Sequence, residues 1–465
     1  MIASKRHLLI VGSIFIYLSC LFVAKRSSHV DFNDKLREEL PGWKKSQNLG
    51  DSTKIAKKEA IWNKMRGVLK PVRRNKHWEK SRNLSANFSA NKVKNTKAFP
   101  RKKYPLPPEN ALLNVAWFSL RTFWHGRHYP RLFNCIKQGK VIVSNAELDP
   151  DGIRQADVVL FAGGFEDEAL WERLRAERDP GQLWLLNTDE SPFTAKTHIP
   201  PIHMRDITFN ITFTYRSNAD ISSPYGYFVA NATKARKLAQ KVNYHEKSPK
   251  LAAWMSSHCD TIAWNRTGFV WDLSQFLTID KYGLCGNMTC GNATKYWERV
   301  VNNWCKRILG QYKFIFALEN SCCTEYISEK FWHILRHYDA IPIVVGAPKE
   351  DYERLAPPRS FIYAADFESM EGLADYIKQV AADPTLYNSY FEWKEQGEVN
   401  VSHEKQRRIG YTAANCRILE YLQGSNITQG HHDLHGPAWL GGCSECGDKK
   451  ILRNYRNSGY SYIQN

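Results

Sequence analysis

The residues best suited to chemistry lie in the stretch FALENSCCTEYISEKFW, residues 316–332. It begins as an apolar run, changes abruptly to Glu-Asn-Ser, and ends with Glu329 and Lys330 side by side. A carboxylate can accept both hydroxyl protons of a ribose diol and a cation can neutralise a diphosphate, so this pair could bind a nucleotide diphosphate. Tyr326 precedes Lys330 by four residues, which places both on nearly the same side of a helix. The alternative is an ordinary solvated helix face, but the position directly after a buried strand favours a ligand site.

This stretch is expected to connect a buried strand, residues 312–318, to a helix that packs on the same sheet. Four apolar residues recur at spacings of four, seven and eight, which predicts one buried stripe: Ile327, Phe331, Ile334 and Leu335. Ligands of open α/β sheets bind beyond the carboxyl ends of the strands, where a helix amino terminus favours phosphate. The Glu-Asn-Ser segment is therefore predicted to mark the ligand end of the sheet.

Similar apolar runs, separated by helical segments and polar turns, occupy most of the chain after residue 110. Runs of this kind indicate parallel strands that are buried on both faces. The expected strands are residues 114–118, 140–144, 156–161 and 182–187, then 250–257, 312–318 and 340–346. A chain of 465 residues is too long for one core. We predict an α/β fold with two Rossmann-like domains, residues 111–247 and 248–425, followed by a cysteine-containing extension, residues 426–465.

The amino-terminal part of the chain has a different composition. Residues 8–24 carry no charge and are flanked by basic residues, which predicts a short transmembrane signal anchor. A cleaved signal peptide is the alternative, although no small-residue cleavage pattern closes the run. Residues 1–7 would then be a cytoplasmic tail, and residues 27–110, rich in Lys, Asn and Ser, a luminal stem.

The charge distribution, the cysteines and the glycosylation sequons indicate the cellular compartment of the folded part and the partners it lacks. Residues 1–110 hold 25 Lys/Arg against 8 Asp/Glu, whereas the rest holds 40 against 39, so the folded part lacks the basic excess that nucleic-acid binding needs. Ten of the eleven cysteines follow the anchor, and in an oxidising lumen they are expected to form mostly disulfides, whose pairing the sequence leaves open. Sequons spread along the chain support the same luminal placement. The N-glycosylation candidates are Asn83, Asn87, Asn210, Asn231, Asn287, Asn292, Asn400 and Asn426.

The segment FALENSCCTEYISEKFWHILRHYDAIPIVVG resembles the signature of the α1,3-fucosyltransferases, with order and spacing intact over about thirty residues. Weaker similarity extends from about residue 111 to residue 395 and includes DESP, YRSNADISSPYG and SYFEWK. The resemblance implies two Rossmann-like domains in the GT-B arrangement behind an anchor and stem. It also implies a Golgi type II membrane enzyme that uses GDP-fucose as its donor.

Carried over residue by residue, the resemblance assigns four residues of the signature to GDP-fucose binding: Asn320, Tyr326, Glu329 and Lys330. Arg266, in SSHCDTIAWNRTGFVWDL, is similar to the family arginine that contacts the diphosphate, although the alignment there is looser. Arg266 also lies inside the sequon that begins at Asn265. We predict that this sequon is unoccupied or that the Asn265 side chain points away from the site.

Glu190, in LWLLNTDESPF, is similar to the carboxylate proposed as the general base of the family. An acceptor hydroxyl that attacks the anomeric carbon must lose a proton, and a carboxylate at the end of a buried strand could take it. Asp189 could serve instead, and an acidic pair that only forms a turn is the simplest alternative. Because the family inverts GDP-β-L-fucose to an α-linked product, one base suffices for a single displacement.

Other motifs are discounted as metal sites. The Asp-Pro-Asp at residues 149–151 is interpreted as a turn, and Lys330 and Arg266 would supply the positive charge of a metal. No obligatory metal is predicted, while stimulation by a divalent cation stays open. A zinc cluster of histidines with Cys443 and Cys446 is possible by type. A Cys443–Cys446 disulfide is favoured in a luminal protein, and the family has a similar Cys-x-x-Cys near its carboxyl end.

Two adjacent cysteines in the signature need a separate explanation. Neighbouring cysteines bridge each other only with strain, so at least one of Cys322 and Cys323 is expected to tie the loop to another cysteine. Neither has a role as a nucleophile in a single displacement.

The leading hypothesis is an inverting α1,3-fucosyltransferase that moves L-fucose from GDP-β-L-fucose to a GlcNAc residue of a glycoprotein or glycolipid glycan. A GT-B transferase for another sugar nucleotide and a membrane-anchored glycan-binding protein without turnover are the alternatives. The expected partners are the glycan acceptor and the Golgi membrane, with no nucleic acid. The acceptor, either the innermost GlcNAc of N-glycans or a terminal lactosamine-type structure, and the oligomeric state do not follow from the sequence.

Overall fold

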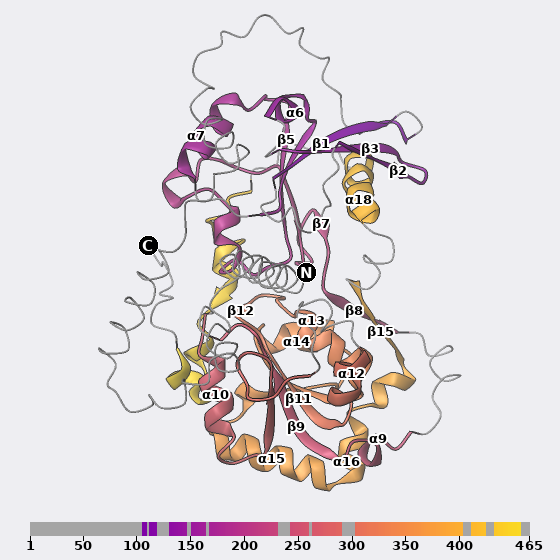
Figure 1. Cartoon of the computed structure of the whole chain (residues 1–465), viewed down its shortest axis with the longest axis vertical. Helices are drawn as coiled ribbons and strands as arrows, with labels where there is room; N and C mark the ends of the chain where they lie inside the picture. The colour runs from indigo at the N-terminus through magenta and orange to yellow at the C-terminus, as the bar shows by residue number, and fades with distance from the viewer. Residues whose placement is uncertain are drawn as a thin grey trace, which may run out of the picture. The chain divides into compact units, whose positions relative to one another are not determined.

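The computed structural model describes residues 105–108, 111–118, 130–146, 150–163, 167–230, 242–259, 263–290, 303–402, 411–424 and 432–456 (Figure 1). The predicted cytoplasmic tail and anchor, and the predicted stem as far as residue 104, lie outside these ranges. Among the helices in the described ranges, none combines the length and the apolar character needed to cross a membrane.

The first domain is built on a seven-stranded sheet with the order β2-β3-β1-β4-β5-β6-β7. All neighbouring strands are parallel except β2 and β3, which form an antiparallel hairpin. The four strands predicted here are confirmed within two residues at each end, because continuous apolar runs form strands buried on both faces. The strands are β1 (Leu112–Phe118), β2 (Arg131–Cys135), β3 (Gly139–Asn145), β4 (Val158–Phe161), β5 (Leu183–Thr188), β6 (Ile211–Thr214) and β7 (Ile221–Ser222).

Three helices pack with this sheet, and one comes from far along the chain. Two are local: α6 (Pro150–Gln155), where a turn had been predicted, and α7 (Glu168–Glu177). The third, α18 (Tyr411–Gly424), contributes Ile418, Leu419 and Leu422 to the core of the first sheet, and the Cys135–Cys416 disulfide joins it to β2. Figure 1 shows α18 beside β2 and β3. The prediction that residues 248–425 form one domain was therefore wrong for this helix. It packs on the first sheet because its apolar residues are buried there.

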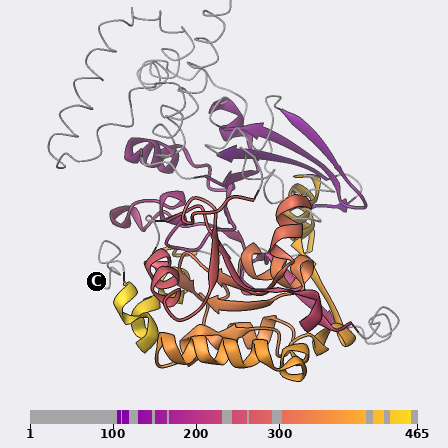
Figure 2. The ribbon, with the colours of Figure 1, turned by 60° about the horizontal axis from the view of Figure 1, so that its bottom comes forward.

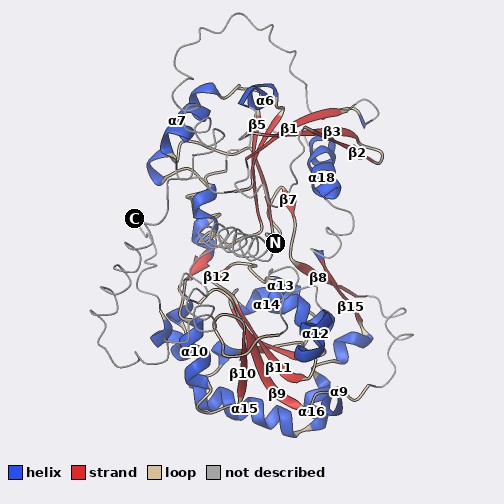
Figure 3. Ribbon diagram, in the orientation of Figure 1, coloured by secondary structure: helices blue, strands red, loops and turns tan. Residues whose placement is uncertain are grey.

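The second domain is built on a five-stranded parallel sheet with the order β10-β9-β11-β13-β14, of which Figure 3 labels β10, β9 and β11. The predicted strands at 250–257, 312–318 and 340–346 are confirmed as β9, β11 and β13, each flanked by parallel neighbours. The strand bounds are β9 (Lys250–Met255), β10 (Ile279–Tyr282), β11 (Tyr312–Leu318), β13 (Ile341–Val345) and β14 (Ile362–Tyr363).

Helices cover both faces of this sheet, as a doubly wound fold requires. The core on one face joins strand residues to α10 (Arg266–Leu273) and α15 (Met370–Ala382), and α15 is the long orange helix of Figure 2. The core on the other face joins the sheet to α12 (Asn303–Leu309), α13 (Glu329–His333) and α14 (Lys349–Leu355). The predicted stripe is confirmed: Ile327, Phe331, Ile334 and Leu335 are all buried, with the last two in a π-helical turn (Ile334–Tyr338). Two short helices complete the domain: α9 (Tyr244–Lys247) and α16 (Pro384–Ser389).

Two short antiparallel ribbons join distant parts of the chain. In the first, β8 (Gly226–Ala230) pairs with β15 (Gly397–Val401). A Cβ atom at Gly226 would lie 2.4 Å from the Trp332 ring, so only glycine permits this close packing. In the second ribbon, β12 (Cys322–Cys323) pairs with β16 (Cys443–Ser444).

The second ribbon decides the disulfides of the signature segment. Cys322 bonds to Cys446 and Cys323 bonds to Cys443, so the predicted Cys443–Cys446 disulfide was wrong. In β12 successive side chains point to opposite faces, which lets each of the two adjacent cysteines reach its own partner. The prediction that at least one of them ties the loop to another cysteine is confirmed. The other disulfides are Cys135–Cys416, Cys259–Cys285 and Cys290–Cys305.

Four of the glycosylation sequons have an asparagine among the described residues. Asn210 is only 7% exposed, and its Oδ1 accepts hydrogen bonds from the Trp184 N–H and from Arg178. This buried amide leaves no room for a glycan in the folded protein, which corrects the prediction for Asn210. Asn265 and Asn287 are exposed, and Asn400 is half-buried. The remaining candidates lie outside the described residues: Asn83, Asn87, Asn231, Asn292 and Asn426.

Candidate active site

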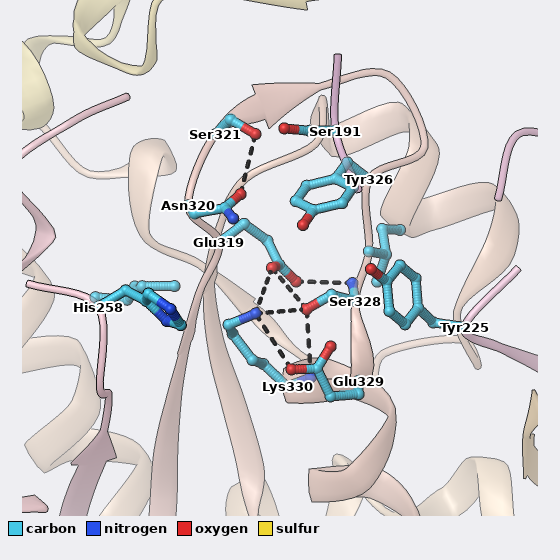
Figure 4. A network of polar contacts seen from close by, with 12 residues as sticks. Ser191, Tyr225, His258, Glu319, Asn320, Ser321, Tyr326, Ser328, Glu329 and Lys330 are labelled. Carbon is cyan, nitrogen blue, oxygen red and sulfur yellow. Dashed lines mark hydrogen bonds and ion pairs between the residues drawn. The ribbon is translucent and has the colours of Figure 1, made fainter. Parts of the chain in front are cut away.

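A buried carboxylate organises the ligand end of the second sheet. Glu319 follows the last residue of β11 and is fully buried. Its Oε1 accepts from the Ser328 N–H at 2.8 Å, and its Oε2 accepts from the Ser328 hydroxyl at 2.7 Å, as Figure 4 shows. A Cβ atom at Gly346 would lie 2.6 Å from Glu319 Cγ, so glycine at the end of β13 makes room for the carboxylate. The network fixes the start of α13 against the sheet.

Lys330 brings a positive charge into this network. Its Nζ lies 3.3 Å from Glu319 Oε2 and 3.4 Å from Glu329 Oε1, and it donates to the Ser328 hydroxyl at 2.9 Å. The Lys330 side chain keeps 29% of its surface exposed, while the Glu319 side chain keeps none. The ammonium group is therefore held from the protein side and reaches the surface at the strand ends, where an anionic ligand could bind.

We call Glu319, Ser328, Glu329 and Lys330 at the end of β11 the cationic wall. Tyr326 links this wall to the first domain. Its ring is 1% exposed and packs against the rings of Tyr215 and Tyr225, with centroids 5.2 and 6.1 Å away. Its hydroxyl donates to Glu190 Oε2 at 3.0 Å. The Tyr225 hydroxyl donates to the main-chain carbonyl of Asp189, the residue next to the predicted base. Tyrosines from both domains thus hold the acidic turn after β5.

The surroundings of Glu190 suit a general base. Burial and the nearby charge of Asp189 raise the pKa of the Glu190 carboxyl, while Lys330 and the hydrogen bond from Tyr326 act in the opposite direction. The net result is a pKa above the ordinary glutamate value. A carboxylate whose pKa approaches the working pH accepts a proton more effectively in the transition state.

Asn320 lies at the same strand end. Its Nδ2 donates to Thr194 Oγ1 at 3.4 Å, and its Oδ1 accepts from the Ser321 hydroxyl at 3.2 Å (Figure 4). The first of these contacts again joins the two domains. The structure therefore brings together five of the six predicted site residues around one strand end: Glu190, Asn320, Tyr326, Glu329 and Lys330.

Arg266 occupies a different position. Its side chain is 2% exposed and donates from Nη1 to the Leu318 carbonyl at 2.8 Å and from Nη2 to the His258 carbonyl at 2.9 Å. Burial lowers the pKa of its guanidinium, although nearby Glu319 counteracts this. Arg266 thus anchors the end of β11 to the loop after β9 beneath the surface. Its contact with a diphosphate stays a prediction.

Asn265 has a structural role at the start of the same helix. It is the N-cap of α10, and its Oδ1 accepts from the Gly268 N–H at 2.8 Å. This bond satisfies one of the helix's free N–H groups. The side chain is exposed, so the prediction that a glycan is absent or directed away from the site stays untested.

Sequence reasoning did not assign roles to Glu319 and Ser328, although they hold the whole wall together. The available signal was a carboxylate directly after the five apolar residues 314–318 of the strand, where an unpaired charge would be costly. Its partner lies nine residues further along, and only the turn back over the strand end brings the two together. In the described part of the chain, no cluster of three or more His, Cys, Asp or Glu side chains is arranged to hold a metal ion.

Comparison with known proteins places this geometry in a family. The carboxyl-terminal profile of glycosyltransferase family 10 (fucosyltransferase) matches residues 245–436, and the amino-terminal fucosyltransferase profile matches residues 111–226. Together the two profiles cover both sheets and all six residues predicted for catalysis or donor binding.

Curated relatives carry fucosyltransferase names. Glycoprotein 3-alpha-L-fucosyltransferase A of Drosophila melanogaster is 35% identical over 245 residues, which cover 52% of this chain and 45% of that protein. Alpha-(1,3)-fucosyltransferase C of Drosophila melanogaster is 29% identical over 65% of this chain and 69% of its own length. A human 4-galactosyl-N-acetylglucosaminide 3-alpha-L-fucosyltransferase, FUT6, is 32% identical over 54% of this chain and 62% of its own length. The chain thus spans about half to two thirds of the length of the relatives it matches.

Among solved structures, an α1,3-fucosyltransferase with GDP-fucose is similar at 16% identity and a TM-score of 0.41, covering 71% of this chain and 96% of that one. The profile matches, which take in two thirds of the sequence, carry the assignment. The chain belongs to glycosyltransferase family 10, the fucosyltransferase family.

Proposed function

We propose that this protein is an inverting α1,3-fucosyltransferase that moves L-fucose from GDP-β-L-fucose to a GlcNAc residue of a glycan. The observation that carries the proposal is the contact between Glu190, at the end of β5 in the first domain, and Tyr326, four residues before Lys330 in the second. A proton acceptor and a cationic wall therefore lie around the same strand end, which is what a displacement with an anionic leaving group requires.

The proposed reaction is a single displacement. The acceptor hydroxyl oxygen forms a bond to the anomeric carbon of fucose while the bond from that carbon to the diphosphate breaks. The electron pair of the broken bond leaves with GDP, and the hydroxyl proton passes to Glu190. Tyr326 occupies Oε2 of that carboxylate, which leaves Oε1 to take the proton. Attack opposite to the leaving group converts the β-linked donor to an α-linked product.

The second domain would hold the donor. Lys330 would stabilise the negative charge that develops on the departing diphosphate, and Glu329 would accept hydrogen bonds from the ribose diol. Asn320 and Tyr326 would line the same site from the end of β11 and from the loop before α13. Arg266 would act from beneath the surface, by fixing the Leu318 carbonyl and the adjoining loop.

The names of the relatives suggest two acceptor classes. One is a glycoprotein 3-fucosyltransferase and another is named for a 4-galactosyl-N-acetylglucosaminide acceptor. GlcNAc is the residue that fits both kinds of name. The choice between N-glycan core and terminal lactosamine would rest with loops of the first domain.

The cellular setting we propose is a Golgi membrane with the catalytic part in the lumen. In the described part of the chain, five disulfides join ten cysteines. Such a number of disulfides is typical of proteins that fold in an oxidising compartment. The anchor at residues 8–24 and the stem at residues 27–110 would hold the two domains in that lumen.

A donor panel tests the proposal directly. The purified full-length protein in detergent should release GDP from GDP-fucose only when a suitable glycan is supplied, with mass spectrometry showing one added fucose. Turnover with UDP-sugars would instead support a transferase for another nucleotide sugar. Binding of GDP-fucose without transfer to any acceptor in a panel of N-glycan cores and lactosamines would support a glycan-binding protein.

A further inference from the structure

A residue that the proposed reaction does not use lies next to the contact between Tyr326 and Glu190 and also joins the two domains. Glu325 directly precedes Tyr326, and its carboxylate reaches the first domain. Oε2 accepts from the Ser217 N–H at 2.5 Å, and Oε1 accepts from the Ser217 hydroxyl at 2.6 Å. Both donors of one residue therefore bind both oxygens of one carboxylate across the two domains.

The same carboxylate is fastened on the side of the second domain. Arg354, in α14, donates to Glu325 Oε1 and to Asp351 Oδ1. Asp351 Oδ2 in turn accepts from the Glu325 N–H at 2.7 Å. The Glu325 side chain keeps only 8% of its surface exposed, although its partners Ser217 and Arg354 are exposed, so the carboxylate itself is largely shielded from water. Burial alone would raise the pKa of Glu325, but the bonds from Ser217 and the charge of Arg354 outweigh it and hold the pKa below the ordinary glutamate value.

The backbone at Glu325 is itself unusual. Its φ of 58° lies in the left-handed region, which a residue with a side chain rarely adopts. Such a conformation persists where surrounding contacts determine it, and it often marks a functional position. The segment is held on both sides: Cys322 and Cys323 are in disulfides before it, and Ser328 is bound to Glu319 after it.

We propose that Glu325 is a positioning residue that clamps the first domain to the segment carrying Tyr326 and thereby sets the hydrogen bond from Tyr326 to Glu190. This inference rests on the proposed function, because it matters for catalysis only if Glu190 is the base. Glu325 would thus keep Ser217 of the first domain close to Tyr326 of the second. The hydrogen bond from Tyr326 to Glu190, and with it the pKa of Glu190, would then depend on how closely the two domains are held, although Glu325 contacts neither donor nor acceptor.

Two sets of charged and titratable groups bear on this coupling. Facing Glu325 are Arg354 and Asp351 from α14 and Tyr215 from the first domain. Facing Glu190 are its neighbour Asp189, the hydroxyls of Tyr225 and Tyr326, and the charges of Glu329 and Lys330. When the clamp opens, the stabilising hydrogen bond from Tyr326 weakens, so the pKa of Glu190 should rise.

The test compares Glu325→Gln with the wild-type full chain. The substitution keeps the shape and removes the charge, so kcat should fall roughly tenfold, the loss expected for one hydrogen bond to a charged group. The Kd for GDP should stay within about twofold, because the network of Lys330, Ser328, Glu319 and Glu329 that would face the diphosphate does not include Glu325. The acid limb of the kcat–pH profile should move to higher pH. A variant that only unfolds more readily would lower the melting temperature without moving that limb.

A matched control and a second variant keep the outcome interpretable. Glu177→Gln removes an exposed carboxylate at the end of α7 that pairs with Arg154 at 3.4 Å and has no part in the contacts of Glu190 or Glu325, so it should change neither kcat nor its pH profile. Ser217→Ala breaks one of the clamp's hydrogen bonds from the other domain and should show the effects of Glu325→Gln in weaker form. If Glu325→Gln does not fold, the kcat and the pH profile of Ser217→Ala alone test the proposed clamp.

Hydrogen exchange separates the clamp from the proposed reaction. Amides of residues 215–222 should exchange faster in Glu325→Gln than in the wild type, whether or not the protein transfers fucose. Absence of transfer by the wild type would overturn the proposed function and leave this readout intact. Unchanged exchange at Ser217 in Glu325→Gln, or an unmoved acid limb together with wild-type kcat in both variants, would overturn the clamp.

Discussion

The cationic wall at Lys330 and the acidic turn at Glu190 are built in different ways. Lys330 and its partner Glu319 are eleven residues apart and belong to one strand, loop and helix of the second domain. Glu190 and its partner Tyr326 are 136 residues apart and belong to different domains. The first arrangement exists as soon as the local segment folds, whereas the second exists only while the domains are held together. Variants that affect one arrangement and spare the other can test this difference.

The largest effect is expected at the acidic turn. Glu190→Gln keeps the hydrogen-bonding shape but cannot take a proton, so kcat should fall by about 10² to 10⁴. Steady-state kinetics with GDP-fucose and a glycan acceptor measures it. Asp189→Asn serves as the companion variant and should lose much less activity. A larger loss in Asp189→Asn than in Glu190→Gln would transfer the role of base to Asp189.

A slightly smaller effect is expected at the cationic wall. Lys330→Ala removes the ammonium group that would stabilise the leaving diphosphate, and by analogy with an oxyanion donor it should cost about 2 to 4 kcal/mol in kcat/KM. It also leaves the buried Glu319 without its counter-charge, so the melting temperature must be measured in parallel. Normal turnover in a folded Lys330→Ala variant would contradict the assigned role.

The disulfides behind the signature segment provide the third comparison. Replacing Cys323 and Cys443 by Ser removes one of two bonds that close nearly the same loop, of 120 and 124 residues, so the free energy of unfolding should fall by less than about 2 kcal/mol. The Cys322–Cys446 bond remains in this variant and should preserve the register of β12 with β16. Chemical denaturation under non-reducing conditions measures the loss. An unchanged unfolding midpoint would show that this bond contributes little to the wall.

The smallest effect of this series is expected from Tyr326→Phe, which keeps the ring packing and removes only the hydroxyl bound to Glu190, so kcat should fall at least as much as in Glu325→Gln, roughly tenfold. Burial already raises the pKa of Glu190 and the hydroxyl opposes that rise, so removing it should raise the pKa further. Because the base works in its deprotonated form, activity is lost as pH falls through that pKa. The acid limb of kcat/KM should therefore move to higher pH, by about one unit or less. A limb that stays in place or moves to lower pH would argue against this hydrogen bond.

Much of the second domain could be predicted because its information is local. The apolar run 314–318 of β11 and the stripe that ends in Leu335 are visible as patterns within a few tens of residues. The signature residues around Lys330 follow in the same stretch, so their common position at one strand end could be expected from fold class alone. The first sheet was predicted only in its continuous apolar strands. The short or half-exposed strands β2, β6 and β7 carry too few residues for a periodic signal.

The errors share one physical cause, which is contact between residues far apart in the chain. Helix α18 packs on the first sheet although it follows the second, because its apolar residues find their partners there. Cys443 and Cys446 bond to Cys323 and Cys322 because an antiparallel ribbon brings them together over 120 and 124 residues. Asn210 satisfies the sequon pattern, yet its amide is buried beside Trp184. None of these contacts has a local sequence signal.

The sequence by itself determined the two-domain α/β organisation, the predominance of disulfides beyond the predicted anchor, and a charged wall at the end of β11. These features depend on apolar periodicity, residue type and short spacing, all of which a chain carries in linear order. Only the tertiary structure decided that Glu319 is the buried partner of Lys330, that Tyr326 binds Glu190, and that Glu325 joins the domains. Those pairings depend on which surfaces meet after the chain has folded, since hydrogen bonds and charges act over a few ångströms in space and not along the sequence.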